Sequence, residues 1–182
     1  MQAAEVEFGE RGFHDAAISG ITARAGVALG TFYVYFDSKK EIFRALVSYM
    51  GHHTRAWIAQ RVADAPDRVA AERRGLEAFI EFAREHKNLY RIVAEAQFVA
   101  EDAFREHYQV FAAAYRDNLA EATKRGDIRT GDCDTRAWAM IGMNVFLGMR
   151  FADWDTSRPA AEIAESVADL IAYGLAGRPR NT

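Results

Sequence analysis

The side chains best suited by type and spacing to bind a charged partner lie in the first quarter of the chain. Thr31 and Tyr35 are four residues apart, so both hydroxyl groups can lie on one side of a short helix. Ser38 and Glu41 have the spacing of a capping box, which predicts that a longer helix starts at Ser38. The free N–H groups of that helix start, together with the ammonium group of Lys39, suit a phosphate oxygen.

Two very short helices must position these groups. The apolar pattern from Ile18 to Ala25 predicts one buried stripe on a two-turn helix. Gly26 favours the positive φ of a helix end, and Val27 is expected to tuck beneath the turn. The stretch from Leu29 to Phe36 predicts a second short helix with Phe32 facing inward. Helices this short cannot bury an apolar face alone, so neighbours must hold them. A helix-turn-helix presents its recognition helix to the DNA major groove in this way.

Four motifs in this segment occur in register, namely Glu10-Arg11-Gly12-Phe13, Ile21-Thr22-Ala23-Arg24-Ala25-Gly26-Val27, Gly30-Thr31-Phe32-Tyr33-Val34-Tyr35-Phe36 and Ser38-Lys39. With them, residues 3–46 resemble the DNA-binding domain of the tetracycline-repressor (TetR) family of transcriptional regulators. The resemblance implies an all-α fold with an N-terminal three-helix helix-turn-helix domain. A C-terminal helical domain for ligand binding and dimerisation would follow, giving about nine helices.

The resemblance also implies which residues contact double-stranded operator DNA. They lie in the first short helix, the turn, the second short helix and the start of the long helix. They are Ser19, Ala28, Leu29, Gly30, Thr31, Tyr33, Val34, Tyr35 and Lys39.

Four positions depart from the family pattern. Ala17 stands where Ser or Thr usually caps the first short helix. Gly20 stands three residues later, where the family usually has an acidic residue. Loss of such a cap costs about 1 kcal/mol, and glycine inside a helix costs about as much again. Ala28 and Leu29 replace residues that are commonly polar, so we expect weaker phosphate contact and an apolar contact from Leu29 to a thymine methyl.

The charge balance allows a second interpretation. The first fifty residues carry five basic and six acidic side chains, and the whole chain has a net charge of −3. Proteins that bind nucleic acid usually show a basic surface. The alternative to a DNA-binding regulator is therefore a relative that binds a ligand or a protein but has lost specific DNA binding.

Composition predicts a soluble cytoplasmic protein, and the resemblance implies that it is associated with the nucleoid when bound to its operator. A chain of 182 residues with 50% hydrophobic residues can bury a core and fits one or two domains. The single Cys133 excludes an internal disulfide and fits a reducing compartment. The longest uncharged run, residues 137–149, is shorter than the roughly 20 residues that span a bilayer.

Strand patterns are absent, and the periodicity predicts helices throughout. The predicted helices cover 2–11, 18–25, 29–36, 38–62, 69–86, 88–97, 101–125, 134–152 and 159–175. The predicted domains are a DNA-binding domain over 1–46, an effector and dimerisation domain over 47–176, and a flexible tail over 177–182.

Aromatic side chains recur at helical spacing in the second predicted domain. An aromatic pocket with a few polar groups is typical of a small-molecule site, although the same residues can also form ordinary core. We expect an apolar effector, aromatic or multi-ring in character. The candidate lining residues are Tyr49, His53, Trp57, Phe79, Phe82, Tyr90, Gln97, Phe104, His107, Tyr108, Phe111, Tyr115 and Asn144.

The last two long helices predict a homodimer. Apolar and small residues repeat there at helical spacing, namely Trp138, Ile141, Val145, Gly148, Ile163, Val167, Leu170 and Gly174. Two such helices from each subunit would form an intermolecular four-helix bundle. The alternative is that both faces are buried inside one chain.

The remaining titratable residues do not form a catalytic pattern. No Glu-x-x-His pair, no His-Glu-x-x-His motif and no phosphate-binding loop occurs, and Cys133 lies in an acidic loop. We therefore expect no enzyme, no cofactor and no metal. The sequence predicts a ligand-responsive transcriptional regulator, with repression the commoner role in the family. The regulator would release its palindromic operator when an effector shifts the position of the long helix over 38–62.

Overall fold

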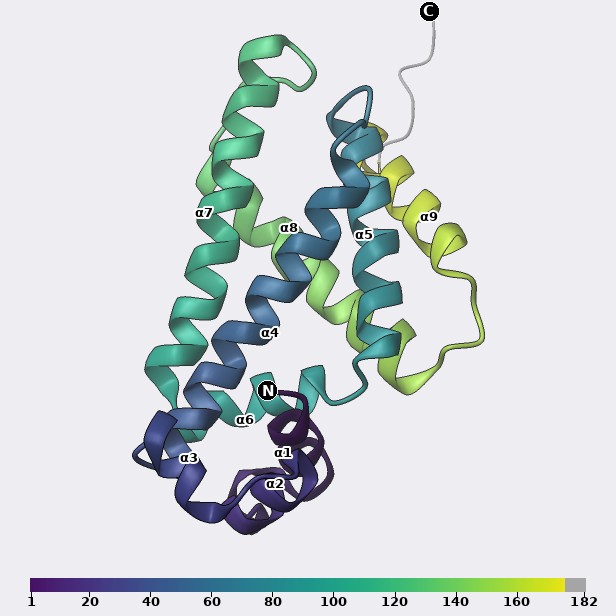
Figure 1. The fold of residues 1–182 in the computed structure, drawn as a ribbon. Helices are drawn as coiled ribbons and strands as arrows, with labels where there is room; N and C mark the ends of the chain where they lie inside the picture. The colour runs from purple at the N-terminus through teal and green to yellow at the C-terminus, as the bar shows by residue number, and fades with distance from the viewer. Residues whose placement is uncertain (176–182) are drawn as a thin grey trace, which may run out of the picture. The chain divides into compact units, whose positions relative to one another are not determined.

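The computed structural model describes residues 1–175, which form nine α-helices and one π-helical turn (Figure 1). In chain order these are α1 (Gln2–Asp15), α2 (Ile18–Ala25), α3 (Leu29–Tyr35), α4 (Lys39–Val62), α5 (Arg68–Glu85), α6 (Leu89–Val99), α7 (Glu101–Arg125), α8 (Cys133–Gly148), η1 (Met149–Trp154) and α9 (Ala160–Tyr173). The predicted all-α fold with an N-terminal helix-turn-helix is confirmed. The tail predicted over 177–182 lies outside the described residues.

Two helices end four residues away from their predicted ends, and the other ends agree within two residues. The first continues to Asp15 instead of residue 11, because the backbone leaves the helical path at Gly12 (φ 76°, ψ 168°) and then makes one further turn. The helix predicted over 134–152 ends at Gly148, and a π-helical turn over 149–154 follows it. In α1 the departure from helical geometry is confined to Gly12.

The turn after α2 has the hydrogen bonds of a Schellman motif. Gly26 adopts a left-handed conformation (φ 69°), its N–H donates to Ala23 O, and the N–H of Val27 donates to Thr22 O at 3.0 Å. The side chain of Val27 is nevertheless 44% exposed, so the expectation that it tucks beneath the turn is wrong. Its backbone completes the turn, while its isopropyl group stays on the surface.

The chain divides into two compact units. The first unit contains residues 1–53 and 86–111, and the second contains 54–85 and the chain from residue 112 onward. Helix α4 therefore contributes residues to both units. The predicted functional boundary after residue 46 does not coincide with the edge of a compact unit, and it stays a prediction.

An aromatic cluster forms the centre of the first unit. The rings of Phe8 and Phe13 on α1 each pack edge-on against Phe43 of α4, with centroid distances of 5.0 and 5.1 Å. Phe8 and Phe43 are fully buried, as are Leu46 and Val47 of α4. Such edge-to-face pairs add to the free energy of burial, so α1 is firmly attached to the start of α4.

The second unit is a bundle in which α5 packs against α8, η1 and α9. Arg84 at the end of α5 donates to the carbonyl of Phe151 at 2.9 Å and to that of Arg158 at 2.6 Å. These bonds attach η1 and the loop before α9 to α5. No helix within residues 1–175 has both the length and the apolar character that crossing a bilayer requires.

A polar group lies inside this bundle. Glu72 of α5 is buried, and it accepts hydrogen bonds from Arg68 at 2.7 Å and from the hydroxyl of Tyr115 at 2.6 Å. Asn144 of α8 donates to the same hydroxyl at 3.2 Å. Burial, and next the charge of Glu72, hold the pKa of Tyr115 well above its usual value, so this hydroxyl stays a donor.

Candidate nucleic-acid interface

Helix α3 is held through one aromatic ring and exposes the rest of its surface. Phe32 is only 5% exposed, whereas Val34 is 75% and Tyr35 is 71% exposed. Eight of the nine residues predicted to contact DNA are exposed, and Lys39 is partly buried. The structure therefore presents the predicted surface outward, although contact of each residue with DNA stays a prediction.

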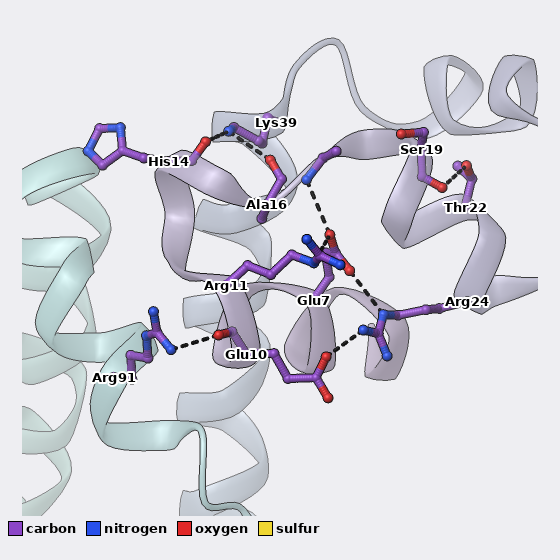
Figure 2. Close-up of polar contacts among 11 residues, drawn as sticks. Glu7, Glu10, Arg11, His14, Ala16, Ser19, Thr22, Arg24, Lys39 and Arg91 are labelled. Carbon is purple, nitrogen blue, oxygen red and sulfur yellow. Dashed lines mark hydrogen bonds and ion pairs between the residues drawn. The ribbon is translucent and has the colours of Figure 1, made fainter.

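The start of α2 is completed by a side chain from α1. Glu7 is 2% exposed, and its Oε1 accepts the backbone N–H of Ala17, the N-cap residue of α2, at 3.3 Å (Figure 2). In a capping box an acid three residues into the helix accepts this same N–H. Glu7 thus supplies, from another helix, the acid that position 20 lacks.

Gly20 provides the space that Glu7 occupies. A Cβ atom added at residue 20 would lie 2.6 Å from Cδ of Glu7, closer than carbon atoms can approach. The small residue at position 20 and the buried carboxylate therefore depend on each other. The two departures from the family pattern at Ala17 and Gly20 belong to one arrangement, which the sequence interpretation treated as two separate losses.

Arginine side chains neutralise the buried carboxylate. Nε of Arg24 donates to Oε2 of Glu7 at 2.9 Å, and Nε of Arg11 lies 3.2 Å from Oε1. Arg24 also bonds Glu10, so α1 and α2 are joined by four charges (Figure 2). Burial alone would raise the pKa of Glu7, but the hydrogen bonds from Arg24 and Ala17 and the two positive charges lower it below its ordinary value.

Lys39 and the start of α4 are also engaged within the protein. Nζ of Lys39 donates to the carbonyls of His14 and Ala16, each at 2.9 Å. The N–H of Glu41 donates to Oγ of Ser38 at 3.2 Å, which confirms the predicted helix start. The Glu41 carboxylate accepts the N–H of Asp37 at 2.6 Å. Lys39 thus ties α4 to the end of α1.

Few positive charges remain available on this face. Arg11 and Arg24 pair with acids of α1, and Arg44 pairs with Asp102. Within the described part of the chain, Lys40 is the one Lys or Arg side chain of the first fifty residues without a hydrogen bond or ion pair to another residue. The surface around α3 is therefore nearly neutral.

Helix α6 contacts the bend in α1. Nη1 of Arg91 donates to the carbonyl of Gly9 at 2.8 Å, and Oε2 of Glu95 accepts the N–H of Phe13 at 2.9 Å. A Cβ added at Gly12, which has a positive φ, would lie 2.6 Å from Oε1 of Glu95. Sequence reasoning missed this contact, and the only signal was an Arg–Glu pair four residues apart in the sixth predicted helix.

The predicted effector residues divide between the two units. In the first unit, ring contacts join Tyr49 to His53 at 4.1 Å and Phe104 to Tyr108 at 5.0 Å. In the second unit, the indole N–H of Trp57 donates to Ala78 O at 3.0 Å. The remaining members are Phe79, Phe82, Tyr115 and Asn144 in the second unit, and Tyr90, Gln97, His107 and Phe111 in the first. Sequence reasoning missed Arg68 and Glu72, which contact Tyr115.

The predicted dimer residues differ in exposure. Trp138 and Leu170 are exposed, whereas Ile141 and Ile163 are buried within the chain. The others are the buried Gly148, the partly buried Val145 and Val167, and the exposed Gly174. Phe146, which the prediction omitted, is 68% exposed on α8.

Comparison with known proteins agrees with this geometry. Residues 1–46 match the family described as "Bacterial regulatory proteins, tetR family". The uncharacterized HTH-type transcriptional regulator YdgC of Bacillus subtilis (strain 168) is 29% identical over 180 residues, which cover 96% of this chain and 90% of that protein.

Two solved structures share the fold. The fatty acid degradation regulator FadR from Bacillus halodurans has a TM-score of 0.83 at 21% identity, covering 97% of this chain and 94% of that chain. The transcriptional regulator FadR from Bacillus subtilis, solved in complex with stearoyl-CoA, has a TM-score of 0.79 at 20% identity, covering 96% of each chain.

A short helix α3 that packs against α2, buries Phe32 and exposes its other side chains is typical of a DNA-binding helix-turn-helix. Residues 1–46 match the TetR family of such transcriptional regulators, and 96% of the chain is similar to an HTH-type transcriptional regulator. The comparisons therefore support a DNA-binding transcriptional regulator. Within residues 1–175, no group of three His, Cys, Asp or Glu side chains is placed to hold a metal ion.

Replacing Gly20 by alanine tests the space that Glu7 occupies. Alanine normally stabilises a helix by about 1 kcal/mol over glycine, but here its Cβ would displace the Glu7 carboxylate, so we expect a lower Tm. The matched control is Gly30→Ala on α3, where a Cβ meets nothing within 4 Å. That variant should raise Tm by about 2–4 °C. Equal stabilisation by both substitutions would contradict the arrangement.

Replacing Glu7 by glutamine tests its charge. The carboxylate has a lowered pKa in the folded state, so its stabilisation is fully present above the unfolded pKa and is lost as pH falls through the folded pKa. Urea unfolding at pH 7 should show Glu7→Gln less stable by about 1–3 kcal/mol. The difference should shrink below about pH 4. The exposed Glu10→Gln should cost about 0–1 kcal/mol, and a Glu7 effect independent of pH would exclude this role.

Proposed function

We propose that this regulator is a repressor that binds a palindromic operator as a homodimer and is released by an apolar effector. The observation that carries the proposal is α3, anchored by buried Phe32 with Val34 and Tyr35 exposed. Two such helices in a dimer would read half-sites about one DNA turn apart, roughly 34–36 Å. The protein would act in the cytoplasm, associated with the nucleoid while bound to its operator.

For the effector we propose a long-chain fatty acyl-CoA. The support is the shared fold with a fatty acid degradation regulator and with a regulator solved in complex with stearoyl-CoA. An acyl chain satisfies the expectation of an apolar ligand, and aromatic side chains are suitable neighbours for it. This choice replaces the aromatic or multi-ring effector expected from sequence.

The coupling would pass through α4, which contributes residues to both compact units. An effector that prefers one position of α4 shifts the population of DNA-binding conformations, and only by its difference in affinity for them. A coupling free energy of about 1–3 kcal/mol changes operator affinity by about 5- to 150-fold.

The direct test is a gel-shift titration with DNA from upstream of this gene and from its divergent neighbour. Purified protein should retard a fragment that contains a palindrome. Stearoyl-CoA should weaken that binding about 5- to 150-fold, whereas coenzyme A alone should not. Release by aromatic compounds but not by stearoyl-CoA would refute the acyl-CoA assignment.

The alternative function is binding of a ligand or a protein without specific DNA recognition. The observation that favours it is the pairing of Arg11, Arg24 and Arg44 with acids, which leaves little positive charge near α3. Retardation of no fragment, with stearoyl-CoA still raising Tm through binding to the native state, would favour this alternative.

The homodimer would form through an apolar stripe on α8. Trp138, Gly142 and Phe146 follow one another at four-residue spacing, and a Cβ added at Gly142 meets nothing within 4 Å in the single chain. Exposed Leu170 on α9 extends the apolar surface of this unit. Two copies of α8 and α9 could bury these groups in a two-fold four-helix bundle.

Replacing Phe146 by glutamate tests this interface. The side chain is largely exposed in one chain, so the fold should persist while two buried charges oppose dimerisation. Sedimentation velocity at micromolar concentration should show a dimer for the wild type and a monomer for Phe146→Glu. Phe98→Glu is the matched control, because Phe98 is an exposed phenylalanine of α6. A wild-type monomer, or a dimeric Phe146→Glu, would contradict the proposed interface.

A further inference from the structure

We infer that this protein recognises its operator mainly by apolar contact of Val34 with thymine methyl groups, and with very few phosphate ion pairs. The inference rests on the proposed binding of a specific operator. It adds the chemical class of base that α3 reads and the residue that reads it.

The outermost ridge of α3 consists of Gly30 and Val34. A helix turns by about 100° per residue, so the positions two before and two after Phe32 lie opposite to its buried ring. Val34 is the most exposed of the large apolar residues of α3, at 75%. A Cβ added at Gly30 meets nothing within 4 Å. The base edges on the floor of the DNA major groove can therefore approach α3 at Gly30 and contact the methyl groups of Val34.

The side chains that usually identify guanine and adenine are missing from this surface. Bidentate readout requires Arg or Lys for guanine and Asn or Gln for adenine. Between residues 17 and 38 the sequence contains no Lys, Asn or Gln, and its one arginine is Arg24. The guanidinium of Arg24 is bonded to Glu7 and Glu10 of α1.

The hydroxyl groups of Thr31, Tyr33 and Tyr35 can donate or accept, so they discriminate poorly between bases. The thymine C5-methyl is the one apolar group in the major groove, and it suits an apolar side chain. The exposed apolar neighbours Val27 and Leu29 increase the apolar area beside Val34. The chemistry of α3 therefore favours thymine over the other bases.

The charge pairing leads to a second, independently measurable consequence. The logarithm of DNA affinity falls with the logarithm of salt concentration with a slope of about −0.9 per neutralised phosphate. Lys40 is the one Lys or Arg side chain of the first fifty residues that the described structure leaves without a partner residue. A dimer with so few available cations should show a slope of about −2 to −4.

The test uses the operator mapped by footprinting, synthesised with thymidine or with deoxyuridine at the positions inside each half-site. Deoxyuridine pairs like thymidine but lacks the methyl group. Fluorescence anisotropy should show a loss of about fourfold in affinity for each contacted methyl, and about 15-fold for a symmetric pair. Deoxyuridine placed outside the footprint should have no effect.

A double-variant cycle assigns the contact to Val34. Val34→Ala should weaken binding to the thymidine operator by a similar factor and should bind the deoxyuridine operator with little further loss. Val110→Ala is the matched control, because Val110 is an exposed valine of α7. It should leave both affinities unchanged.

The outcomes separate this inference from the proposed function. Failure to bind any fragment from the two promoters overturns both. Specific binding that ignores the thymine methyl groups, or that has a salt slope of −6 or steeper, overturns the inference and leaves the repressor proposal standing. Sensitivity to deoxyuridine that is equal in the wild type and Val34→Ala removes the assignment to Val34.

Discussion

The buried carboxylate of Glu7 is the interaction on which the DNA-binding domain depends. It accepts the N–H at the start of α2, pairs with Arg24 and Arg11, and fits only because residue 20 is glycine. A buried charge is costly unless its partners and hydrogen bonds compensate for the lost hydration. The direction of α2 relative to α1 is therefore restricted to one arrangement. Because α2 packs against α3, this arrangement also directs the exposed face of α3.

The position of α1 depends in turn on a second set of hydrogen bonds, which joins the backbone of α1 to side chains of α6. The bend at Gly12 turns the N–H of Phe13 toward Glu95 and leaves the carbonyl of Gly9 for Arg91. Both partners come from α6, which belongs to the same compact unit. Backbone groups that a straight helix would satisfy internally are satisfied here by a neighbour, so the bend and α6 stabilise each other.

Local patterns were sufficient to predict the short helices and the start of α4. The apolar spacing of Ile21 and Phe32, the turn at Gly26 and the cap at Ser38 each act within a few residues. The role of Glu7 could not be predicted in this way, because it acts across ten residues on another helix. Aromatic spacing predicted Tyr115, and Asn144 was predicted as a polar group of the same pocket. Glu72 was not predicted, because a charged residue gives no apolar signal even when tertiary contacts bury it.

The low positive charge at the surface of the DNA-binding domain and the ion pairs between its helices have the same cause. Its arginines stabilise the contacts between helices, and therefore little positive charge is left for DNA.

The central claim is that α3 itself enters the major groove. The most direct measurement is operator affinity by anisotropy for the wild type and Val34→Glu, with Tm measured on both proteins. If α3 enters the groove, Val34→Glu should leave Tm unchanged and should lower operator affinity at least 100-fold. Equal affinities would contradict this claim.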